Sequence, residues 1–391
     1  MTLRSRVAGL RGASPLGGGR RSARADLLEL ARAGPAPLAP DPSSADGPWV
    51  VAVLIPDFRR GSGGHATIAR LIEALRERGH RPSLWLIDSD GRHLAESEAE
   101  TERRFHEYFA IEDVELHSDF RAWTGADIVV ATGWQTVATA LLLPAGAGRA
   151  YLVQDHEPDF YGASAEALWA RASYGHGLHC IAASPWLAEL LRDRYAASAS
   201  HFELALDHSV YRPGGVARRE DLVVFYARAV TPRRAVPLGL LALTELQRRR
   251  PALELALYGD VDDPSPSFAH RHLGVLGAPA LADLYSRATV GMVLSLTNPS
   301  LIGLEMMACG LPCVELASES MLASFGREGP LALAAADPVA LCEALERLLD
   351  DPARRRAVAE AGLALSAGRT WERAARQVED GLRLALTRAS R

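Results

Sequence analysis

The segment 290–316 of the chain reads VGMVLSLTNPSLIGLEMMACGLPCVEL. Its two ends, 290–294 and 313–316, are short apolar runs that predict buried strands. Between them, residues 301–309 predict a helix that is apolar on nearly every side, as in a helix packed against a sheet. A strand, a helix and a second strand in this order predict one unit of a parallel sheet, because parallel neighbours need a crossover connection.

The same alternation extends in both directions and fills two stretches of the chain, 48–214 and 215–370. The expected strands are 50–55, 83–87, 128–131, 151–154 and 180–182 in the first stretch, and 222–226, 255–258, 290–294 and 313–316 in the second. A chain of 391 residues is long enough for two such domains. The expected fold class is therefore α/β, with two doubly wound parallel sheets facing each other across a cleft.

The two ends of the chain differ from the predicted domains. Residues 1–47 are rich in Ala, Gly, Pro, Ser and Arg, so we expect a disordered basic extension. We expect its arginines to be solvated, and contact of Arg20, Arg21 and Arg24 with anionic lipid is the alternative. Residues 371–391 predict a last helix that reaches back to the first domain.

Composition argues against several classes of protein. The chain is 48% hydrophobic and 23% charged, which is typical of a globular protein, and its net charge of -5 argues against nucleic acid as a partner. The cysteines lack the spacing of a metal site or a disulfide framework and predict reduced thiols in a cytoplasmic protein; they are Cys180, Cys309, Cys313 and Cys342. No apolar run is long enough for a membrane span, so we expect membrane contact to be peripheral where it occurs.

Three motifs stand in or just before the second domain. They are, in chain order, DHSVYRP at 207–213, YARAVTPR at 226–233 and NPSLIGLEMMACGLP at 298–312. In the second motif, Arg228 and Arg233 lie five residues apart, directly after a predicted strand. Such a pair of cations can bind phosphate oxygens.

With these motifs, the chain resembles the family 4 retaining glycosyltransferases of the GT-B fold. The first motif resembles the family's Asp-x-x-x-aromatic-x-Pro linker, and the second its phosphate clamp, with Arg233 where Lys is usual. The third resembles the signature Leu-Glu-Ala-Met-Ala-x-Gly-x-Pro. One departure concerns the family's paired glutamates, because the position eight residues before Glu305 is Thr297.

Within that family, the chain resembles the rhamnan-synthesis branch typified by the rhamnosyltransferase WsaF, over about residues 48–385. The residues that carry this likeness are LTNPSLI at 296–302, YLVQDHEP at 151–158 and ASPWLAE at 183–189. The resemblance implies a nucleotide-sugar donor, dTDP-β-L-rhamnose, used with retention by internal return. It also implies a glycan or glycolipid acceptor.

The resemblance places the donor site in the second domain. Arg228 and Arg233 would bind the diphosphate together with the start of the helix at 301–309, and with Asp155 they are the predicted catalytic residues. Glu305 would accept a hydrogen bond from the ribose. The full set of predicted donor-binding residues is Thr297, Asn298, Ser300, Leu301, Ile302, Glu305, Tyr258, Leu273 and Gly274. Surface ion pairs are the alternative for Arg228 and Arg233, and an internal ion pair with one of the arginines is the alternative for Glu305.

The first domain is expected to bind the acceptor. A glycine-rich loop precedes its first helix, where missing side chains let a substrate approach backbone amides. A polar trio follows the strand at 151–154. The predicted acceptor-binding residues are Gly63, Gly64, His65, His156 and Glu157. A cluster that only caps and packs is the alternative for Asp155, His156 and Glu157.

Different functions fit parts of the same sequence. The spacing Gly-x-Gly-x-x-Ala66 with Asp88 imitates a dinucleotide-binding fingerprint, although its glycines come well after the first strand. Asp88-Ser-Asp90 and Asp260-Val-Asp262 imitate a metal-binding Asp-x-Asp, but we expect no metal, because the arginines already neutralise phosphate. The sequence also fits a transferase for UDP- or GDP-sugars, or a noncatalytic module that binds a nucleotide or a sugar.

Overall fold

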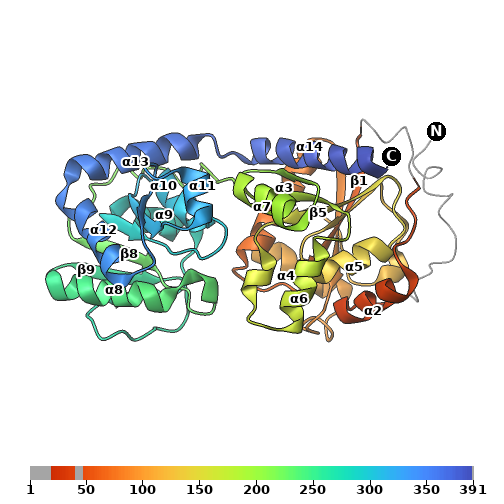
Figure 1. The fold of residues 1–391 in the computed structure, drawn as a ribbon, viewed down its shortest axis with the longest axis horizontal. Coiled ribbons are helices and arrows are strands. Elements are labelled where there is room, and N and C mark those ends of the chain that lie inside the picture. The colour runs from red at the N-terminus through yellow and green to blue at the C-terminus, as the bar shows by residue number, and fades with distance from the viewer. Residues whose placement is uncertain (1–18, 40–46, 390–391) are drawn as a thin grey trace. The chain divides into compact units, whose positions relative to one another are not determined.

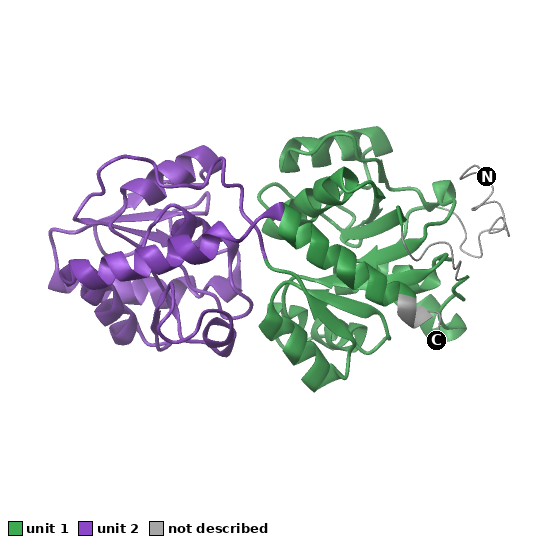
Figure 2. Cartoon of the chain, turned by 90° about the horizontal axis from the view of Figure 1, so that it is seen from above, with its two compact units in different colours: residues 1–203, 372–391 green, residues 204–371 purple. Residues whose placement is uncertain are grey.

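The chain folds into two compact α/β units, which Figure 2 colours separately. The computed structural model describes residues 19–39 and 47–389. The bounds are residues 1–203 with 372–391 for unit 1, and residues 204–371 for unit 2. Unit 2 is thus inserted in the sequence of unit 1 and begins at Leu204, earlier than the expected residue 215.

Unit 1 is built on a parallel sheet in the order β3-β2-β1-β4-β5-β6-β7 (Figure 1). Its described strands are β1 (Val50–Pro56), β2 (Arg81–Ile87), β3 (Leu116–His117), β4 (Ile128–Ala131), β5 (Gly148–Val153), β6 (His179–Ala182) and β7 (Ala199–His201). Its described helices are α2 (Ala23–Ala33), α3 (Gly63–Glu77), α4 (Glu98–Phe109), α5 (Trp134–Leu142), α6 (Ala165–Ser173), α7 (Pro185–Tyr195) and α14 (Trp371–Ala389), with short 3-10 turns η3 (Phe120–Ala122) and η4 (Glu157–Phe160).

Unit 2 repeats this plan with a parallel sheet in the order β10-β9-β8-β11-β12-β13. Its described strands are β8 (Leu222–Tyr226), β9 (Glu254–Tyr258), β10 (Arg271–His272), β11 (Val290–Met292), β12 (Cys313–Leu316) and β13 (Ala332–Ala334). Its described helices are α8 (Val236–Arg249), α9 (Ala278–Arg287), α10 (Leu301–Ala308), α11 (Glu319–Phe325), α12 (Pro338–Asp350) and α13 (Pro352–Ala367), with the 3-10 turn η5 (Pro232–Arg234). Both sheets therefore confirm the doubly wound parallel fold predicted from the alternation of strands and helices.

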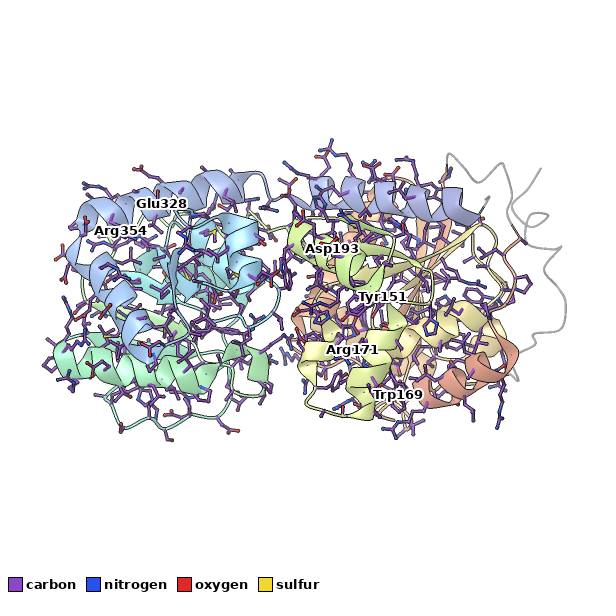
Figure 3. The ribbon with its side chains drawn as sticks, in the orientation of Figure 1. Tyr151, Trp169, Arg171, Asp193, Glu328 and Arg354 are labelled. Atoms are coloured by element: carbon purple, nitrogen blue, oxygen red, sulfur yellow. The ribbon has the colours of Figure 1, made fainter. Side chains whose placement is uncertain are left out.

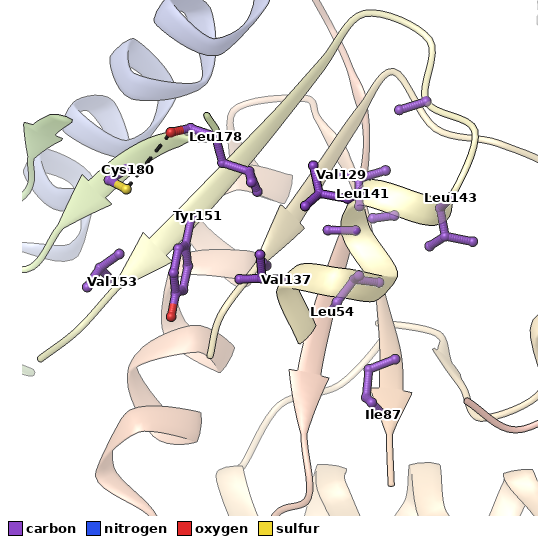
Figure 4. Packing of buried hydrophobic residues seen from close by; sticks show 14 of the residues in the cluster. Leu54, Ile87, Val129, Val137, Leu141, Leu143, Tyr151, Val153, Leu178 and Cys180 are labelled. Atoms are coloured by element: carbon purple, nitrogen blue, oxygen red, sulfur yellow. Dashed lines mark hydrogen bonds between the residues drawn. The ribbon is translucent and has the colours of Figure 1, made fainter. Parts of the chain in front are cut away.

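The core of unit 1 lies between the sheet and its helices. Leu54, Val129 and Tyr151 on three neighbouring strands are fully buried, and Val137 and Leu141 of α5 pack on the same face (Figure 4). Burying one such aliphatic side chain contributes about 1.5 to 3 kcal/mol. The apolar runs are continuous because both faces of a parallel sheet are covered by helices.

Helix α14 returns the end of the chain to unit 1 (Figures 1 and 2). It lies so close to the sheet that a Cβ atom at Gly381 would meet Ile181 Cγ1 at 2.7 Å. On its neighbouring face, the buried Glu379 pairs with Arg78 and Arg383. The helix is therefore a structural part of unit 1.

The structure corrects the expectation of a disordered extension for residues 19–39. Helix α2 packs along α5 (Figure 1), and Ala36 N donates to Leu141 O at 2.8 Å. Arg21 and Asp26, which are 7% and 3% exposed, form an ion pair of 2.7 Å beneath this segment. Composition misled here, because Ala and Arg are common both in solvated tails and in packed helices. The rest of the predicted extension, 1–18 and 40–46, lies outside the described residues.

The alternative of lipid contact is corrected for Arg21, whose guanidinium is buried. Arg20 is exposed and donates to His93 O at 2.6 Å. Arg24 is exposed and lies 3.5 Å from Glu166. Among the residues that the structure describes, no helix combines the length and apolar character of a membrane span.

We expect Asp26→Ala to lower the free energy of unfolding by about 3 kcal/mol, because it leaves the buried Arg21 charge with only the more distant Glu29, at 3.6 Å. Arg24→Ala is the matched control and should change stability by less than about 1 kcal/mol, because its pair is exposed. Urea unfolding of the three proteins measures both values. Equal stability of Asp26→Ala and the wild type would mean that α2 does not hold unit 1 together.

Candidate functional site

The strand order of unit 2 creates a natural binding position. Strand β8 has β9 on one side and β11 on the other, so the chain winds away from β8 in both directions. In open parallel sheets, ligands bind beyond the carboxyl ends of the strands where the order reverses. The loops at this position are 227–235 after β8 and 293–300 after β11.

Both predicted phosphate-binding arginines lie in the loop after β8. Arg228 and Arg233 are half-buried, and Leu296 N donates to Arg233 O at 3.0 Å, which ties this loop to the one after β11. The Arg228 guanidinium makes no hydrogen bond or ion pair with any residue in 19–39 or 47–389. The predicted surface ion pair is therefore not found for Arg228, which leaves its charge available to a ligand.

A third arginine, which was not predicted from the sequence, braces the same position. Arg234 Nη1 donates to Ser295 Oγ at 2.7 Å, and Ser295 N donates to Glu315 Oε1 at 2.8 Å. Glu315 lies at the end of β12 and is 2% exposed, and its burial raises its pKa to about 7. In the sequence, the only feature that could have indicated this network was the acidic Glu315 inside an otherwise apolar strand. The network links three strand ends around Arg228 and Arg233.

The helix that begins beside these loops is α10. Its N-cap Ser300 accepts a hydrogen bond from Ile302 N at 3.2 Å, and the predicted Leu301 and Ile302 are half-buried there. Thr297 and Asn298 are 4% and 3% exposed. The structure thus places these five predicted donor-binding residues together, at a helix start where amide groups attract anions.

Glu305 lies one turn further along α10. Its Oε2 is buried without a hydrogen-bond partner among the described residues, and none of the arginines described forms an ion pair with it. Burial raises its pKa to about 7, and the nearby Tyr211 hydroxyl partly offsets this effect. A buried oxygen without a donor is costly, so the geometry favours a ligand hydroxyl over the internal ion pair.

Three further predicted donor-binding residues occupy different settings. Tyr258 is 1% exposed, and its hydroxyl lies 2.9 Å from the Tyr285 hydroxyl, so its side chain belongs to the core. This corrects its assignment as a side-chain contact to the donor. Leu273 and Gly274 follow the short strand β10, where Gly259 N donates to Gly274 O at 2.8 Å. They lie at the same carboxyl-end edge, two strands from β8.

In unit 1, the glycine-rich loop lies at the corresponding switch position between β1 and β4. Gly63 and Gly64 begin α3, and Gln154 donates to Gly64 O at 3.1 Å. His65 is 8% exposed, with its ring nitrogens 2.8 Å from Ser62 Oγ and 3.1 Å from Pro56 O. Burial lowers its pKa to about 4, so the ring is neutral and holds the loop. Its side chain is therefore not free to bind an acceptor.

The polar trio after β5 is also mostly internal. Glu157 accepts hydrogen bonds from Tyr151 Oη at 2.6 Å and Trp134 N at 2.8 Å, and burial raises its pKa to about 7. The His156 ring lies 2.6 Å from Tyr195 Oη. Both side chains thus have partners inside the protein, as the capping and packing alternative expects, and their assignment to the acceptor stays a prediction. Asp155 is half-buried and accepts from His156 N at 2.9 Å.

A carboxyl pair at the ends of β1 and β2 was not predicted as such. The register pairs Pro56 with Ile87, so Asp57 and Asp88 follow side by side. Their Oδ1 atoms are buried without a donor among the described residues. Burial and the neighbouring Asp88 raise the pKa of Asp57 to about 8, although Asp90 N donates to it. Within 19–39 and 47–389, no group of three acidic, His or Cys side chains has the geometry to hold a metal.

Comparison with known proteins agrees with this arrangement. Residues 221–346 match the family described as WsaF, C-terminal domain. The O-antigen biosynthesis protein RfbC of Myxococcus xanthus is 34% identical over 195 residues, covering 48% of this chain and 15% of that protein. The D-inositol 3-phosphate glycosyltransferase of Frankia alni is 31% identical over 234 residues, covering 51% of this chain and 57% of that protein. The chain thus spans well under two thirds of each relative.

Solved structures show the fold. Sucrose-phosphate synthase from Thermosynechococcus elongatus superposes with a TM-score of 0.65 at 18% identity, over 87% of this chain and 99% of that one. Anabaena HepE in complex with UDP-glucose gives a TM-score of 0.64 at 12% identity, over 85% and 99%. The fold is therefore GT-B, with two Rossmann-like units, as the sequence predicted.

We expect Asp57→Asn to flatten the pH dependence of stability. The folded chain holds a proton on Asp57 up to about pH 8, whereas the unfolded chain loses it near 3.8, so wild-type stability falls as the pH rises between these values. The variant lacks this fall in the free energy of unfolding, which we expect to be on the order of 2 kcal/mol after solvent screening. Unfolding by urea at pH 5, 7 and 9 measures it.

Asp90→Asn is the control for this prediction, because Asp90 is exposed and its backbone bond to Asp57 remains. Asp90→Asn should keep the wild-type slope of the free energy of unfolding against pH. Parallel slopes for the wild type and Asp57→Asn would show that the folded chain does not hold a proton on Asp57 in this pH range.

Proposed function

We propose that the protein is a glycosyltransferase that moves a sugar from a nucleotide-sugar donor to a glycan or glycolipid acceptor. The observation that carries this proposal is the arrangement at the switch position of unit 2. Arg228, with no protein partner in the described chain, stands with Arg233 at the loop joined to the start of α10. The match of residues 221–346 to the WsaF C-terminal domain supports it independently.

This arrangement suits the departure of a nucleoside diphosphate. Breaking the bond between sugar and phosphate leaves negative charge on the diphosphate, and fixed donors aimed at that charge lower the barrier. Two guanidinium groups offer paired N–H donors, and the first turn of α10 adds unpaired amides. Because the arginines supply the positive charge, the proposal needs no metal ion.

Glu305 would bind the ribose of the same nucleotide. Its unpaired Oε2 lies within α10, one turn past the amides assigned to the phosphates. A ribose hydroxyl supplies the missing donor. Thymidine offers a single 3′-hydroxyl to such a carboxylate, whereas uridine offers two.

For the donor, we propose dTDP-β-L-rhamnose, used with retention by internal return. Thr297 replaces the carboxylate that the family uses for the sugar, which fits a 6-deoxyhexose with a different pattern of hydroxyls. UDP-glucose is the second candidate, because Anabaena HepE binds it on the same fold. In internal return, the departing phosphate accepts the proton of the acceptor hydroxyl.

For the acceptor, we propose the carboxyl-end edge of unit 1. The space beside Gly63 is open to a ligand, and Asp155 is the member of the polar trio whose side chain is not fully buried. Asp155 would orient the acceptor hydroxyl and polarise it. A cytoplasmic protein with peripheral contact to a membrane that presents the acceptor fits this proposal.

Donor choice can be tested directly. We expect release of dTDP from dTDP-rhamnose to exceed release of UDP from UDP-glucose, and to persist with EDTA.

Arg228→Ala and Arg233→Ala should each lower turnover by roughly 100-fold, the usual effect of removing one such donor, without lowering the melting temperature. Turnover of UDP-glucose alone would replace the rhamnose assignment, and nucleotide binding without turnover of any donor would indicate a noncatalytic module.

We expect Glu305→Gln to weaken binding of the nucleoside diphosphate by roughly tenfold, because a hydrogen bond to a charged acceptor contributes about 1.5 to 3 kcal/mol. The pKa of about 7 adds a second signature. Wild-type affinity should rise between pH 6 and pH 8 as the carboxyl group ionises, and the variant should lack this part of the rise. Calorimetry at both pH values measures the difference, and identical affinities would remove Glu305 from the ribose site.

A further inference from the structure

An array of four aromatic rings lies beside the carboxyl-end edge of unit 1. Its members, which we call the aromatic array, are Trp134, Phe160, Tyr161 and Trp169. They come from the start of α5, the end of η4 with the residue after it, and α6. Figure 3 shows Trp169 on α6, apart from Tyr151 in the sheet. Pairwise ring contacts thus connect the connection that follows β4 with the connection that follows β5.

The aromatic array is rigid. Trp134 is 6% exposed, and its Nε1 donates to Tyr161 Oη at 2.9 Å. The Trp134 and Trp169 ring centres are 5.6 Å apart, and those of Phe160 and Tyr161 are 6.5 Å apart. Rings fixed in this way lose little conformational freedom when a ligand binds, which favours affinity.

The outer rings of the aromatic array are accessible. Phe160 is 37% exposed, and Tyr161 and Trp169 are half-buried. Single exposed apolar residues are ordinary, but a fixed group of partly open rings is a typical binding surface. The catalytic proposal for unit 2 does not use these rings.

Two accessible carboxylates accompany these rings along the chain. The Asp159 side chain, directly before Phe160, is 52% exposed and holds one oxygen 2.7 Å from His156 Nδ1. The Glu166 side chain, three residues before Trp169 on α6, is 32% exposed. A surface with flat apolar faces and acidic hydrogen-bond acceptors fits a sugar ring, whose C–H groups cover the aromatic face while its hydroxyls donate to the carboxylates.

We propose that the aromatic array binds a pyranose ring of the acceptor glycan. This rests on the proposed function, and it names a neutral carbohydrate as the class of acceptor held by unit 1. The polar trio and Gly63–Gly64 lie at the same edge, so a glycan held on Phe160 and Tyr161 would extend along the carboxyl ends of β4 and β5.

The test measures binding of methyl α-L-rhamnopyranoside and methyl α-D-glucopyranoside to the full chain by saturation-transfer NMR. We expect saturation of the ring C–H protons in the wild type. Phe160→Leu, which keeps apolar area but removes the ring, should weaken binding roughly two- to tenfold, whereas Phe160→Trp should retain it. Leu241→Ala is the matched control, because Leu241 is 59% exposed on α8 of unit 2.

The outcomes separate this inference from the proposed function. Equal binding by Phe160→Leu and the wild type, or no saturation of either glycoside by the wild type, would overturn it. Stronger binding of tetramethylammonium than of both glycosides would also overturn it and assign the array to an organic cation. Nucleotide binding is measured on the same samples. A wild type that does not bind nucleotide would reject the proposed function. A wild type that binds nucleotide but not the glycosides would reject only the role of the aromatic array.

Discussion

Parallel pairing of every described strand is the constraint on which the rest of the molecule depends. In each sheet all carboxyl ends meet at one edge, so every loop that follows a strand is brought there, however distant its sequence. Arg234, Ser295 and Glu315 come together for this reason, since they follow or end three neighbouring strands. Asp57 and Asp88 meet in the same way in unit 1. The chemistry of both units is thus a consequence of strand direction.

The two units use this shared geometry differently. In unit 1, the first amide of α5 is bound by the Glu157 carboxylate, so the positive end of that helix is occupied by the protein itself. In unit 2, the start of α10 has the neutral Ser300 hydroxyl and two arginines nearby. The positive end of the helix is therefore bound by a carboxylate in unit 1 and by an uncharged hydroxyl in unit 2. The two units thus share a topology and differ in a few capping residues.

The sequence predicted those features that depend on the local pattern of apolar residues. Continuous apolar runs predicted the strands, because strands covered on both faces have no polar positions. Arg228, Arg233 and Glu305 were also predicted from such runs and their spacing, and their roles in donor binding stay predictions. The partners of His65, His156 and Glu157, which are Pro56, Tyr195 and Trp134, could not be predicted, because they are set by tertiary packing. Likewise, the anchoring of α2 depends on the pairing of Arg21 with Asp26 and their burial under α5, which composition does not encode.

The return of α14 to unit 1 has a consequence for how the chain is made. During synthesis, residues 204–371 emerge before α14, whereas the sheet of unit 1 waits for that helix. Until then Ile181 and the neighbouring strand surface stay uncovered, and Arg78 lacks Glu379. The unit that begins first is therefore completed only after unit 2 has been made, and a ribosome stalled within α14 would hold a chain with a complete second unit and an uncovered first one.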